Sequence, residues 1–339
     1  MPAKKKRPPA PPPKVVHPNA AGIDVGSEAH VVAVPGDRDP EPVRTFGVFT
    51  ADLRQLADWL KPCGVTTLVL ESTGVYWMSL GDFLEGQGFE VLVVDPRSLA
   101  RNLKKKTDVS DAAWLQELHA FGMLKSCFRP DGEVRALRTW WRHRDHLVTE
   151  AAKLLQMMQK VLVQMNVYLH LAVADSAGVT GRRLLRAIAQ GQHDPQTLAA
   201  LRDTHCKKTR AEIATALEGT WDPAHLFELK HLLKAWDFYH GQLHVCDKEY
   251  DQAAGKMPDK TQGRAMPEPE KRPTKQRKSP TAFASDDLIF KMTGVRLTEV
   301  DGLGANTVLT VLSETGPDLA AKFATEKHFA AWTTLAPRT

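Results

Sequence analysis

The stretch "AGIDVGSEAHVVAV", residues 21–34, decides the fold class of this chain. Residues 21–25 and 31–34 are apolar runs of strand length separated by a polar turn, which predicts two adjacent strands. Asp24 places a charge inside the first run, between glycines that let another backbone or a ligand approach closely. Taken alone, an aspartate at the edge or end of a strand explains Asp24 without catalysis.

The residues that follow continue this pattern. Further strands are predicted at residues 44–49, 66–70 and 89–94, and helices at 53–60 and 76–84. Strands in meander, followed by alternating strands and helices, predict a mixed α/β sheet covered on both faces. The ribonuclease H type of sheet is one such arrangement.

From Glu133 onward the pattern changes to long helices. Apolar residues at 3,4 spacing predict a coiled-coil seam, with Arg144 as its only polar interruption. The apolar residues of this seam are Val134, Leu137, Trp141, Val148, Ala151, Leu155, Met158, Leu162, Met165 and Leu169. Helices near residues 182–189 and 210–217 precede a second seam, formed by Leu226, Leu229, Leu233, Trp236, Leu243 and Tyr250. The two seams predict an antiparallel helical hairpin or a dimerising arm, with an ordinary helical bundle as the alternative.

The chain therefore divides into five predicted segments. They are a disordered, basic, proline-rich tail (1–19), the α/β domain (20–130), a helical coiled-coil region for dimerisation (131–254), a Pro/Lys-rich linker (255–283) and a small helical domain (284–339).

Composition limits the class of protein. With 339 residues, 42% hydrophobic and 25% charged, the chain has globular composition. Its apolar runs fall far short of the roughly 20 residues of a membrane span, and the N-terminus has no apolar signal core. The four cysteines lie far apart, which favours neither a disulfide framework nor a zinc site. We expect a soluble cytoplasmic protein.

The formal net charge of +5 is concentrated in three patches. The tail carries five basic residues and no acid, and residues 255–280 carry eight against three acids. The third patch consists of Arg97, Arg101, Lys104, Lys105 and Lys106, again with no acid among them. Any single charge run is usually a solvated surface. Three patches beside acidic residues favour a polyanionic partner such as nucleic acid.

Three more acids join Asp24 as candidate metal ligands. Glu71 closes a buried strand at the strand-to-helix junction where α/β sheets place ligands, although alone it also fits a solvated loop acid. Asp108 and Asp111 would share one face of a helix starting near Thr107; capping and the helix dipole explain that pair equally well. Four acids together make a hard oxygen site suited to Mg²⁺ and phosphoryl transfer.

Six motifs carry a resemblance to a known family. They are "AGIDVGSEAHVVAV", "LVLESTGVYW", "KTDVSDAAWL", "VRALRTWWRHRDHLV", "LTEVDGLGANTVLTVLSETG" and "AAWTTLAPRT", in this order from about residue 20 to the last residue. The combination resembles the DEDD transposases of bacterial insertion sequences, also called bridge-RNA-guided recombinases. The order of "ESTG" and then "KTDxxDA" is its most specific part.

The resemblance implies a RuvC-like ribonuclease H domain, a dimerising coiled coil and a C-terminal transposase domain. It also implies that Asp24, Glu71, Asp108 and Asp111 hold Mg²⁺, and that a structured guide RNA pairs with donor and target DNA in the bacterial nucleoid. In that family a serine of the C-terminal domain attacks the DNA phosphate. Here the sequence stops at Thr339 before that serine, so we expect the metal half of the site without the nucleophile.

Two further motifs allow other interpretations. Gly302 and Gly304 in "VDGLG" resemble a helix-hairpin-helix turn whose backbone N–H groups bind phosphate, although a plain helix-helix turn fits as well. "GIDVGS" also resembles the first phosphate loop of the actin and sugar-kinase superfamily, but the second phosphate loop of that fold has no counterpart. A catalytically incomplete nucleic-acid-binding scaffold is the remaining alternative.

Overall fold

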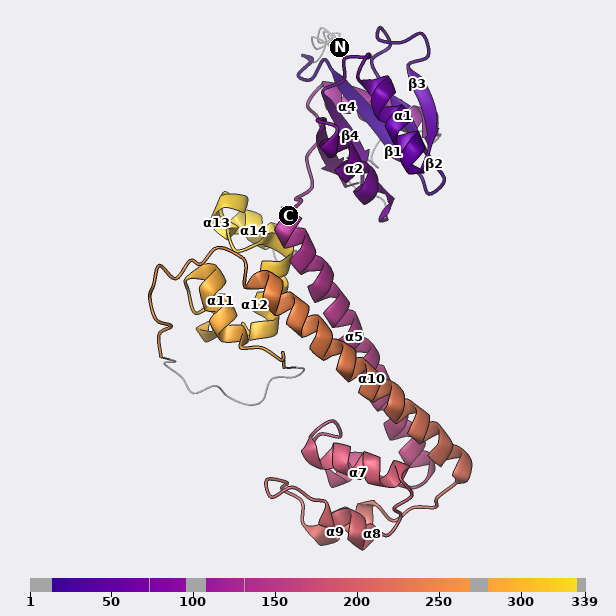
Figure 1. Cartoon of the computed structure of the whole chain (residues 1–339), viewed down its shortest axis with the longest axis vertical. Helices are drawn as coiled ribbons and strands as arrows, with labels where there is room; N and C mark the ends of the chain where they lie inside the picture. The colour runs from indigo at the N-terminus through magenta and orange to yellow at the C-terminus, as the bar shows by residue number, and fades with distance from the viewer. Residues whose placement is uncertain (1–13, 73, 96–107, 131, 269–279, 334–339) are drawn as a thin grey trace, which may run out of the picture. The chain divides into compact units, whose positions relative to one another are not determined.

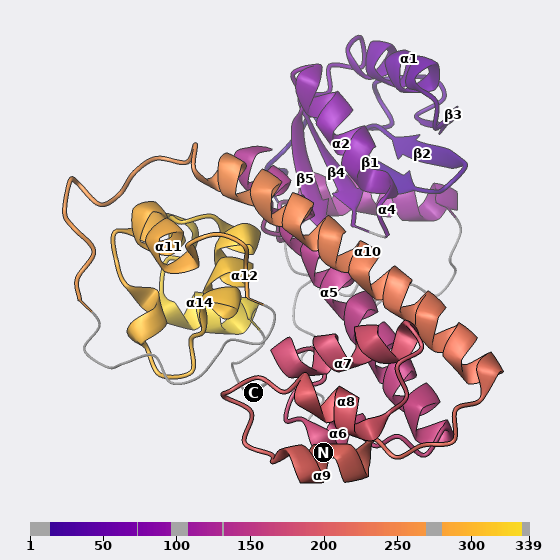
Figure 2. The ribbon, with the colours of Figure 1, turned by 60° about the horizontal axis from the view of Figure 1, so that its bottom comes forward.

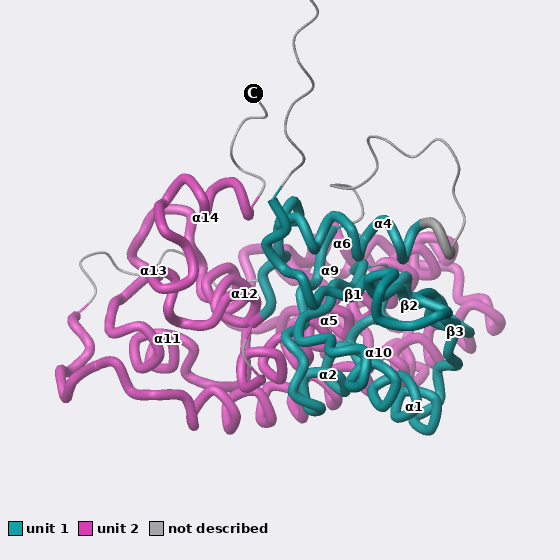
Figure 3. The backbone as a smooth tube through the Cα atoms, turned by 90° about the horizontal axis from the view of Figure 1, so that it is seen from above, with its two compact units in different colours: residues 1–129 teal, residues 130–339 magenta. Residues whose placement is uncertain are grey.

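The computed structural model describes residues 14–72, 74–95, 108–130, 132–268 and 280–333. The chain forms two compact units, Met1–Arg129 and Pro130–Thr339, which are described separately below. Figure 3 draws the first unit in teal and the second in magenta.

The first unit is built on a five-stranded mixed sheet. Its strands are β1 (Ala20–Val25), β2 (Ala29–Ala33), β3 (Val43–Gly47), β4 (Thr67–Glu71) and β5 (Glu90–Val94). They are ordered β3-β2-β1-β4-β5, with β2 antiparallel to both β1 and β3, and with β4 parallel to β1 and β5. The predicted strands are confirmed, and the arrangement is consistent with a ribonuclease H-like fold.

Helices cover both faces of this sheet. Helices α1 (Thr50–Leu60) and α2 (Tyr76–Gly86) pack on one face, where Ile23 and Leu70 are buried with Leu56 and Leu80. Helix α4 (Asp108–Ala120) covers the other face, where Val69 is buried with Leu115. Figure 2 shows the sheet between these two layers. Each strand divides its side chains between the faces because successive residues of a strand point in opposite directions.

The second unit is organised by two long helices, α5 (Gly132–Gln164) and α10 (Pro223–Ala254), which lie side by side in Figure 1. They are antiparallel, because Val134 near the start of α5 clusters with Ala254 at the end of α10, and Met158 clusters with Leu229. The two predicted seams therefore meet within one chain as an antiparallel helical hairpin.

Of the two predicted alternatives the structure has the helical hairpin, and dimerisation through the first seam stays a prediction. Leu137, Met158 and Leu162 are fully buried within the chain itself. Heptad spacing identifies a buried stripe but not which helix covers it. Since α10 and its neighbours cover this stripe, it does not need a second chain.

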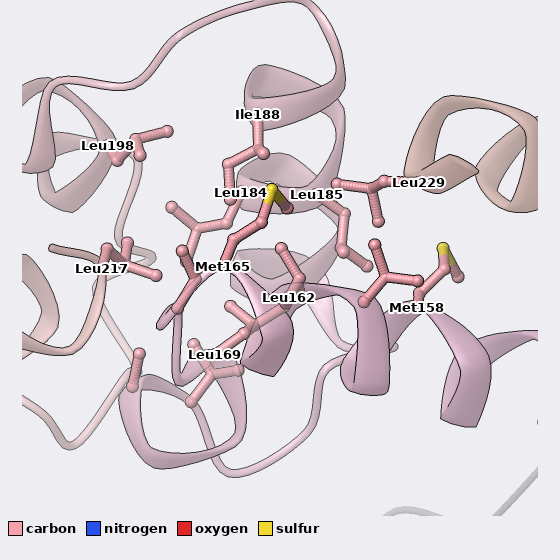
Figure 4. Close-up of a cluster of buried hydrophobic side chains, with 14 of the residues drawn as sticks. Met158, Leu162, Met165, Leu169, Leu184, Leu185, Ile188, Leu198, Leu217 and Leu229 are labelled. Atoms are coloured by element: carbon pink, nitrogen blue, oxygen red, sulfur yellow. The ribbon is translucent and has the colours of Figure 1, made fainter. Parts of the chain in front are cut away.

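Four short helices between α5 and α10 complete the larger core of the unit. They are α6 (Leu169–Ala172), α7 (Val179–Ala189), α8 (Pro195–Ala200) and α9 (Arg210–Ala216). Figure 4 shows Leu184, Leu185 and Ile188 from α7 pointing toward Leu162 of α5 in an apolar cluster. No helix in the described parts of the chain is long and apolar enough to span a membrane.

The C-terminal helices are α11 (Ser285–Thr293), the 3-10 turn η1 (Leu297–Glu299), α12 (Ala305–Thr315), α13 (Leu319–Lys322) and α14 (Glu326–Trp332). Of these, α11 and α12 share an apolar core with the first half of α5. Val308 and Leu312 of α12 share an apolar cluster with Leu137. Trp141 Nε1 donates a 2.8 Å hydrogen bond to Thr310 Oγ1, and Arg142 pairs with Glu314.

A buried ion pair joins three parts of this unit. Arg144, the polar residue in the first seam, donates from Nε to Asp247 Oδ1 on α10 at 2.5 Å, and a second guanidinium nitrogen donates to the Pro280 carbonyl at 3.2 Å. The other oxygen of Asp247 accepts from the Ala282 backbone N–H at 2.8 Å. The pair therefore fixes the chain that enters α11 against both long helices.

Candidate metal centre at the carboxyl edge of the sheet

Asp24 and Glu71 lie at equivalent positions on two neighbouring strands. β1 and β4 are parallel with Ile23 opposite Leu70, so Asp24 and Glu71 occupy the next position on each strand. Ile23 and Leu70 face α1 and α2. The alternation of side chains puts Asp24 and Glu71 on the face that α4 covers. Both acids are half-buried at the carboxyl ends of their strands.

Contacts along α4 fix its direction across this face. His119 near its end has its ring Nε2 2.9 Å from the hydroxyl of Thr67, the first residue of β4. From Thr67 to Glu71 the strand rises by about 13 Å. From His119 back to Asp111 the helix rises by about 12 Å. Helix α4 therefore runs antiparallel to β4, so that its first turn, with Asp111, lies toward the carboxyl ends of the strands.

Gly22 allows α4 to lie directly on β1. A Cβ atom at Gly22 would be 2.4 Å from the Ala112 carbonyl oxygen and 2.3 Å from the Gln116 backbone nitrogen. Gln116 Nε2 also donates to the Ala20 carbonyl at 3.3 Å. The predicted close approach of another backbone beside Asp24 is confirmed, and that backbone belongs to α4.

Asp111 carries an unsatisfied oxygen. The residue is only 8% exposed, and its Oδ1 is buried without a hydrogen-bond partner among the described residues. A buried carboxylate oxygen without a donor is costly unless a cation or another donor reaches it. The residue therefore fits a ligand of a hard cation such as Mg²⁺, which prefers carboxylate oxygens.

The structure does not show these four acids as one set of metal ligands. Asp108 is the first residue of α4, and its side chain lies outside the described part of the chain. Within the described residues, no three histidine, cysteine, aspartate or glutamate side chains are close enough to hold a metal ion. Convergence of all four acids on one metal centre stays a prediction.

His119 was missed by the sequence analysis. Burial, and in second place the neighbouring His17, whose ring stacks at 4.9 Å, lower the pKa of its ring from 6.5 to about 4. A neutral ring at neutral pH can be either donor or acceptor toward Thr67. A polar residue on the sheet-facing side of the predicted helix was the available signal, but its partner 52 residues away could not be read from spacing.

Most of the residues predicted to contact nucleic acid lie outside the part of the chain that the structure describes. Arg97, Arg101, Lys104, Lys105 and Lys106 all belong to residues 96–107, which the structure does not describe. The described residues on either side are informative. Val94 pairs with Glu71 at the end of β5, and α4 starts at Asp108.

Gly302 and Gly304 lie in an exposed turn before α12. Gly302 has φ +87°, a conformation that favours glycine, and an added Cβ at either glycine would meet nothing within 4 Å. Gly304 is the residue that precedes the first turn of α12. The turn is therefore open to solvent, and phosphate binding there stays a prediction.

A five-stranded mixed sheet with acids at its carboxyl edge is the architecture of a ribonuclease H-like domain that acts on nucleic acid. Two family comparisons agree with it. Residues 21–167 match the model DEDD_Tnp_IS110, described as a transposase, and residues 295–339 match the model described as transposase IS116/IS110/IS902 family. The chain therefore belongs to the class of DEDD transposases.

It belongs to the IS110 family of insertion-sequence transposases. Its N-terminal domain is the DEDD domain, and its C-terminal domain is the one that the second family model matches. Membership implies phosphoryl transfer on DNA and the use of a divalent metal ion. A comparison with curated proteins gave no match.

Proposed function

We propose that this chain catalyses Mg²⁺-dependent DNA strand cleavage and exchange in the transposition of an insertion sequence. Asp24, Glu71, Asp108 and Asp111 would hold the metal ion. The observation that supports the proposal is that Asp24 and Glu71 occupy equivalent positions on the parallel strands β1 and β4, on the face that α4, the helix of Asp111, covers.

In this proposal the residues of the edge have two roles. The four carboxylates hold and orient the metal, which when bound stabilises the charge that develops on the phosphate oxygens. The basic segment that contains Lys104, Lys105 and Lys106 holds the DNA backbone beside them. Asp111 supports the first role because its buried oxygen has no donor among the described residues.

The proposed partners are DNA and a structured guide RNA, as the resemblance implies. The three basic patches support a polyanionic partner. Association into a homodimer or higher homo-oligomer is retained from the resemblance. The exposed turn at Gly302 and Gly304 is a proposed backbone contact to phosphate.

Two described serines do not suit the role of nucleophile. Ser313 is fully buried and hydrogen-bonded to the Tyr250 hydroxyl at 2.8 Å, and Ser285 is buried at the start of α11. A nucleophile must reach a DNA phosphate, so neither serine is a candidate in this arrangement.

The test is cleavage of a DNA substrate by the chain in the presence of guide RNA and Mg²⁺. Asp111→Ala and Asp108→Ala should abolish Mg²⁺-dependent cleavage and leave DNA binding within about twofold, because the acids contact the metal rather than the polymer. Asp37→Ala is the matched control, since Asp37 is an exposed acid of the same unit. If either variant lost DNA binding to the same extent as cleavage, the replaced aspartate would have a structural role at the start of α4 instead.

If the unmodified chain binds DNA but shows no Mg²⁺-dependent cleavage, the alternative of a catalytically incomplete scaffold would replace the proposal. Binding itself is tested by its salt dependence. Replacing Lys104, Lys105 and Lys106 by Ala should reduce the slope of log K against log salt by about 0.9 for each lost contact with duplex DNA. An unchanged slope would place this cluster away from the polymer.

A further inference from the structure

An exposed apolar group of side chains lies along the same edge of the first unit as the acids. Its members, which we call the apolar rim, are Phe49, Val75, Tyr76 and Met78, which are 77%, 66%, 50% and 44% exposed. Phe49 caps α1, Val75 caps α2, and the other two residues lie in the first turn of α2. Exposed apolar side chains that gather at one edge of a fold mark a place of contact.

The strand pairing puts the rim at the carboxyl edge. Gly47 at the end of β3 pairs with Ala29, next to the turn that follows β1, and α1 starts directly after it. Ser72 donates its backbone N–H to Val94 at the end of β5, so the chain leaves the sheet at Glu71 and enters α2. Both helices therefore begin where β1 and β4 end.

Local packing holds Tyr76 outward. Trp77 is partly buried in the core beneath α2, and the Arg129 guanidinium lies 5.3 Å over its ring. Arg129 also pairs with Asp82 and Glu85 on α2. Because Trp77 and Arg129 fix the first turn of this helix, Val75, Tyr76 and Met78 project from a rigid base.

We infer that the apolar rim stacks against unpaired nucleobases of the strand whose phosphate is held at the acids, an inference that rests on the proposed function. Aromatic and apolar side chains bind the flat faces of bases, which are accessible where a strand is unpaired. Four side chains are too small an area for a stable protein interface, which needs about 800 Å² per partner.

The experiment measures binding of the full chain to two DNA probes in Ca²⁺, which binds oxygen ligands as Mg²⁺ does. One probe is a duplex with a short unpaired segment that contains 2-aminopurine, and the other is the same duplex fully paired. Tyr76→Ala should weaken binding of the first probe by about 5- to 100-fold, which is the loss of one stacked base. Tyr76→Phe should stay within about twofold of the unmodified chain, because the phenyl ring retains the stacking surface.

Met78→Ala and Met123→Ala form the matched pair, since both methionines are exposed in the same unit. Met123 follows the end of α4, at the opposite edge from the acids, and is 65% exposed. Met78→Ala should weaken binding of the unpaired probe and Met123→Ala should not. The fluorescence of 2-aminopurine should be quenched by the unmodified chain and recover with Tyr76→Ala.

Three outcomes overturn the inference. Unchanged affinity and quenching with Tyr76→Ala, in a chain that still binds DNA, would refute the stacking role and leave the proposed function intact. A change of oligomeric state with Tyr76→Ala, without a change in affinity, would make the rim a protein contact. Failure of the unmodified chain to bind either probe would refute the proposed function together with the inference.

Discussion

The ring of His119 and the hydroxyl of Thr67 are hydrogen-bonded at 2.9 Å, across the end of the sheet farthest from the acids. This bond fixes the last turn of α4 at the start of β4. Because a helix and a strand of these lengths rise by similar distances, it also determines where the first turn of α4 lies. The position of Asp111 thus depends on a contact about 12 Å away along the helix.

His119 should make the first unit sensitive to acid. The folded protein keeps the ring neutral, because its pKa is lowered from 6.5 to about 4, whereas the unfolded chain takes up a proton below pH 6.5. The free energy of unfolding should therefore fall as pH drops from 6.5 toward 4, by up to about 2 kcal/mol between pH 6.5 and 5. Urea unfolding at several pH values measures this loss.

The variant His119→Gln isolates this effect. In this variant the free energy of unfolding should change much less between pH 6.5 and 4. His143→Gln is its control, since His143 is exposed on α5. An unchanged pH dependence in His119→Gln would show that another group is responsible.

Replacing Gly22 by Ala should displace α4 from β1. The new Cβ would be 2.3 Å from the Gln116 nitrogen, which is backbone and cannot move aside without the helix. Overpacking of this kind costs about 1–3 kcal/mol in the free energy of unfolding, which denaturant titration measures. Mg²⁺-dependent cleavage should also fall, because Asp111 moves with the helix.

Gly36→Ala is the control for this substitution, since a Cβ there meets nothing within 4 Å and Gly36 does not have positive φ. A fully stable, active Gly22→Ala chain would contradict the close packing of α4 on β1.

Asp111→Asn should remove a stabilising effect of Mg²⁺. The substitution keeps the shape of the side chain and removes the charge, so the chain without metal should be as stable as before or more stable, by up to about 1 kcal/mol. Millimolar Mg²⁺ should raise the melting temperature of the unmodified chain and leave that of the variant unchanged. Asp37→Asn should behave as the unmodified chain. An equal Mg²⁺ shift in both chains would exclude Asp111 as a ligand.

Breaking the buried pair of Arg144 and Asp247 from one side should destabilise the second unit strongly. Arg144→Met leaves the Asp247 carboxylate buried with the Ala282 N–H as its one remaining donor among the described residues, and the expected loss is about 3–5 kcal/mol in the free energy of unfolding. The double variant Arg144→Met with Asp247→Leu should recover much of that loss, because no charge is left buried. A double-mutant cycle in urea measures the coupling. Additive losses would show that the two residues act independently.

The strands and helices of the first unit were predictable because their signal is local. Apolar alternation in β1 and β2 and a buried run in β4 specify strands without knowledge of their neighbours. The four acids were predicted as a set from the resemblance, and their convergence on one metal centre stays a prediction. Their environment was not predictable, because it depends on the Gly22 approach and on the His119 contact, which join residues about 50 to 100 positions apart.

The helical region shows a different limit. The heptad spacing identified which face of α5 is buried, as Leu137 and Met158 confirm. Spacing contains no information about the identity of the covering helix, so a second chain and α10 were equally compatible with the pattern. The partner of Arg144 was hidden for the same reason, because Asp247 lies 103 residues away on α10.

The straight path of α5 also sets a length scale for any ligand of the second unit. Helices α11 and α12 pack near Leu137, whereas the short helices that follow α5 pack near Leu162. These positions are 25 residues apart along one helix, which corresponds to about 38 Å. A duplex with a rise of about 3.4 Å per base pair covers this distance with about 11 base pairs. A nucleic acid that touches both ends of α5 must therefore extend over roughly one full helical turn.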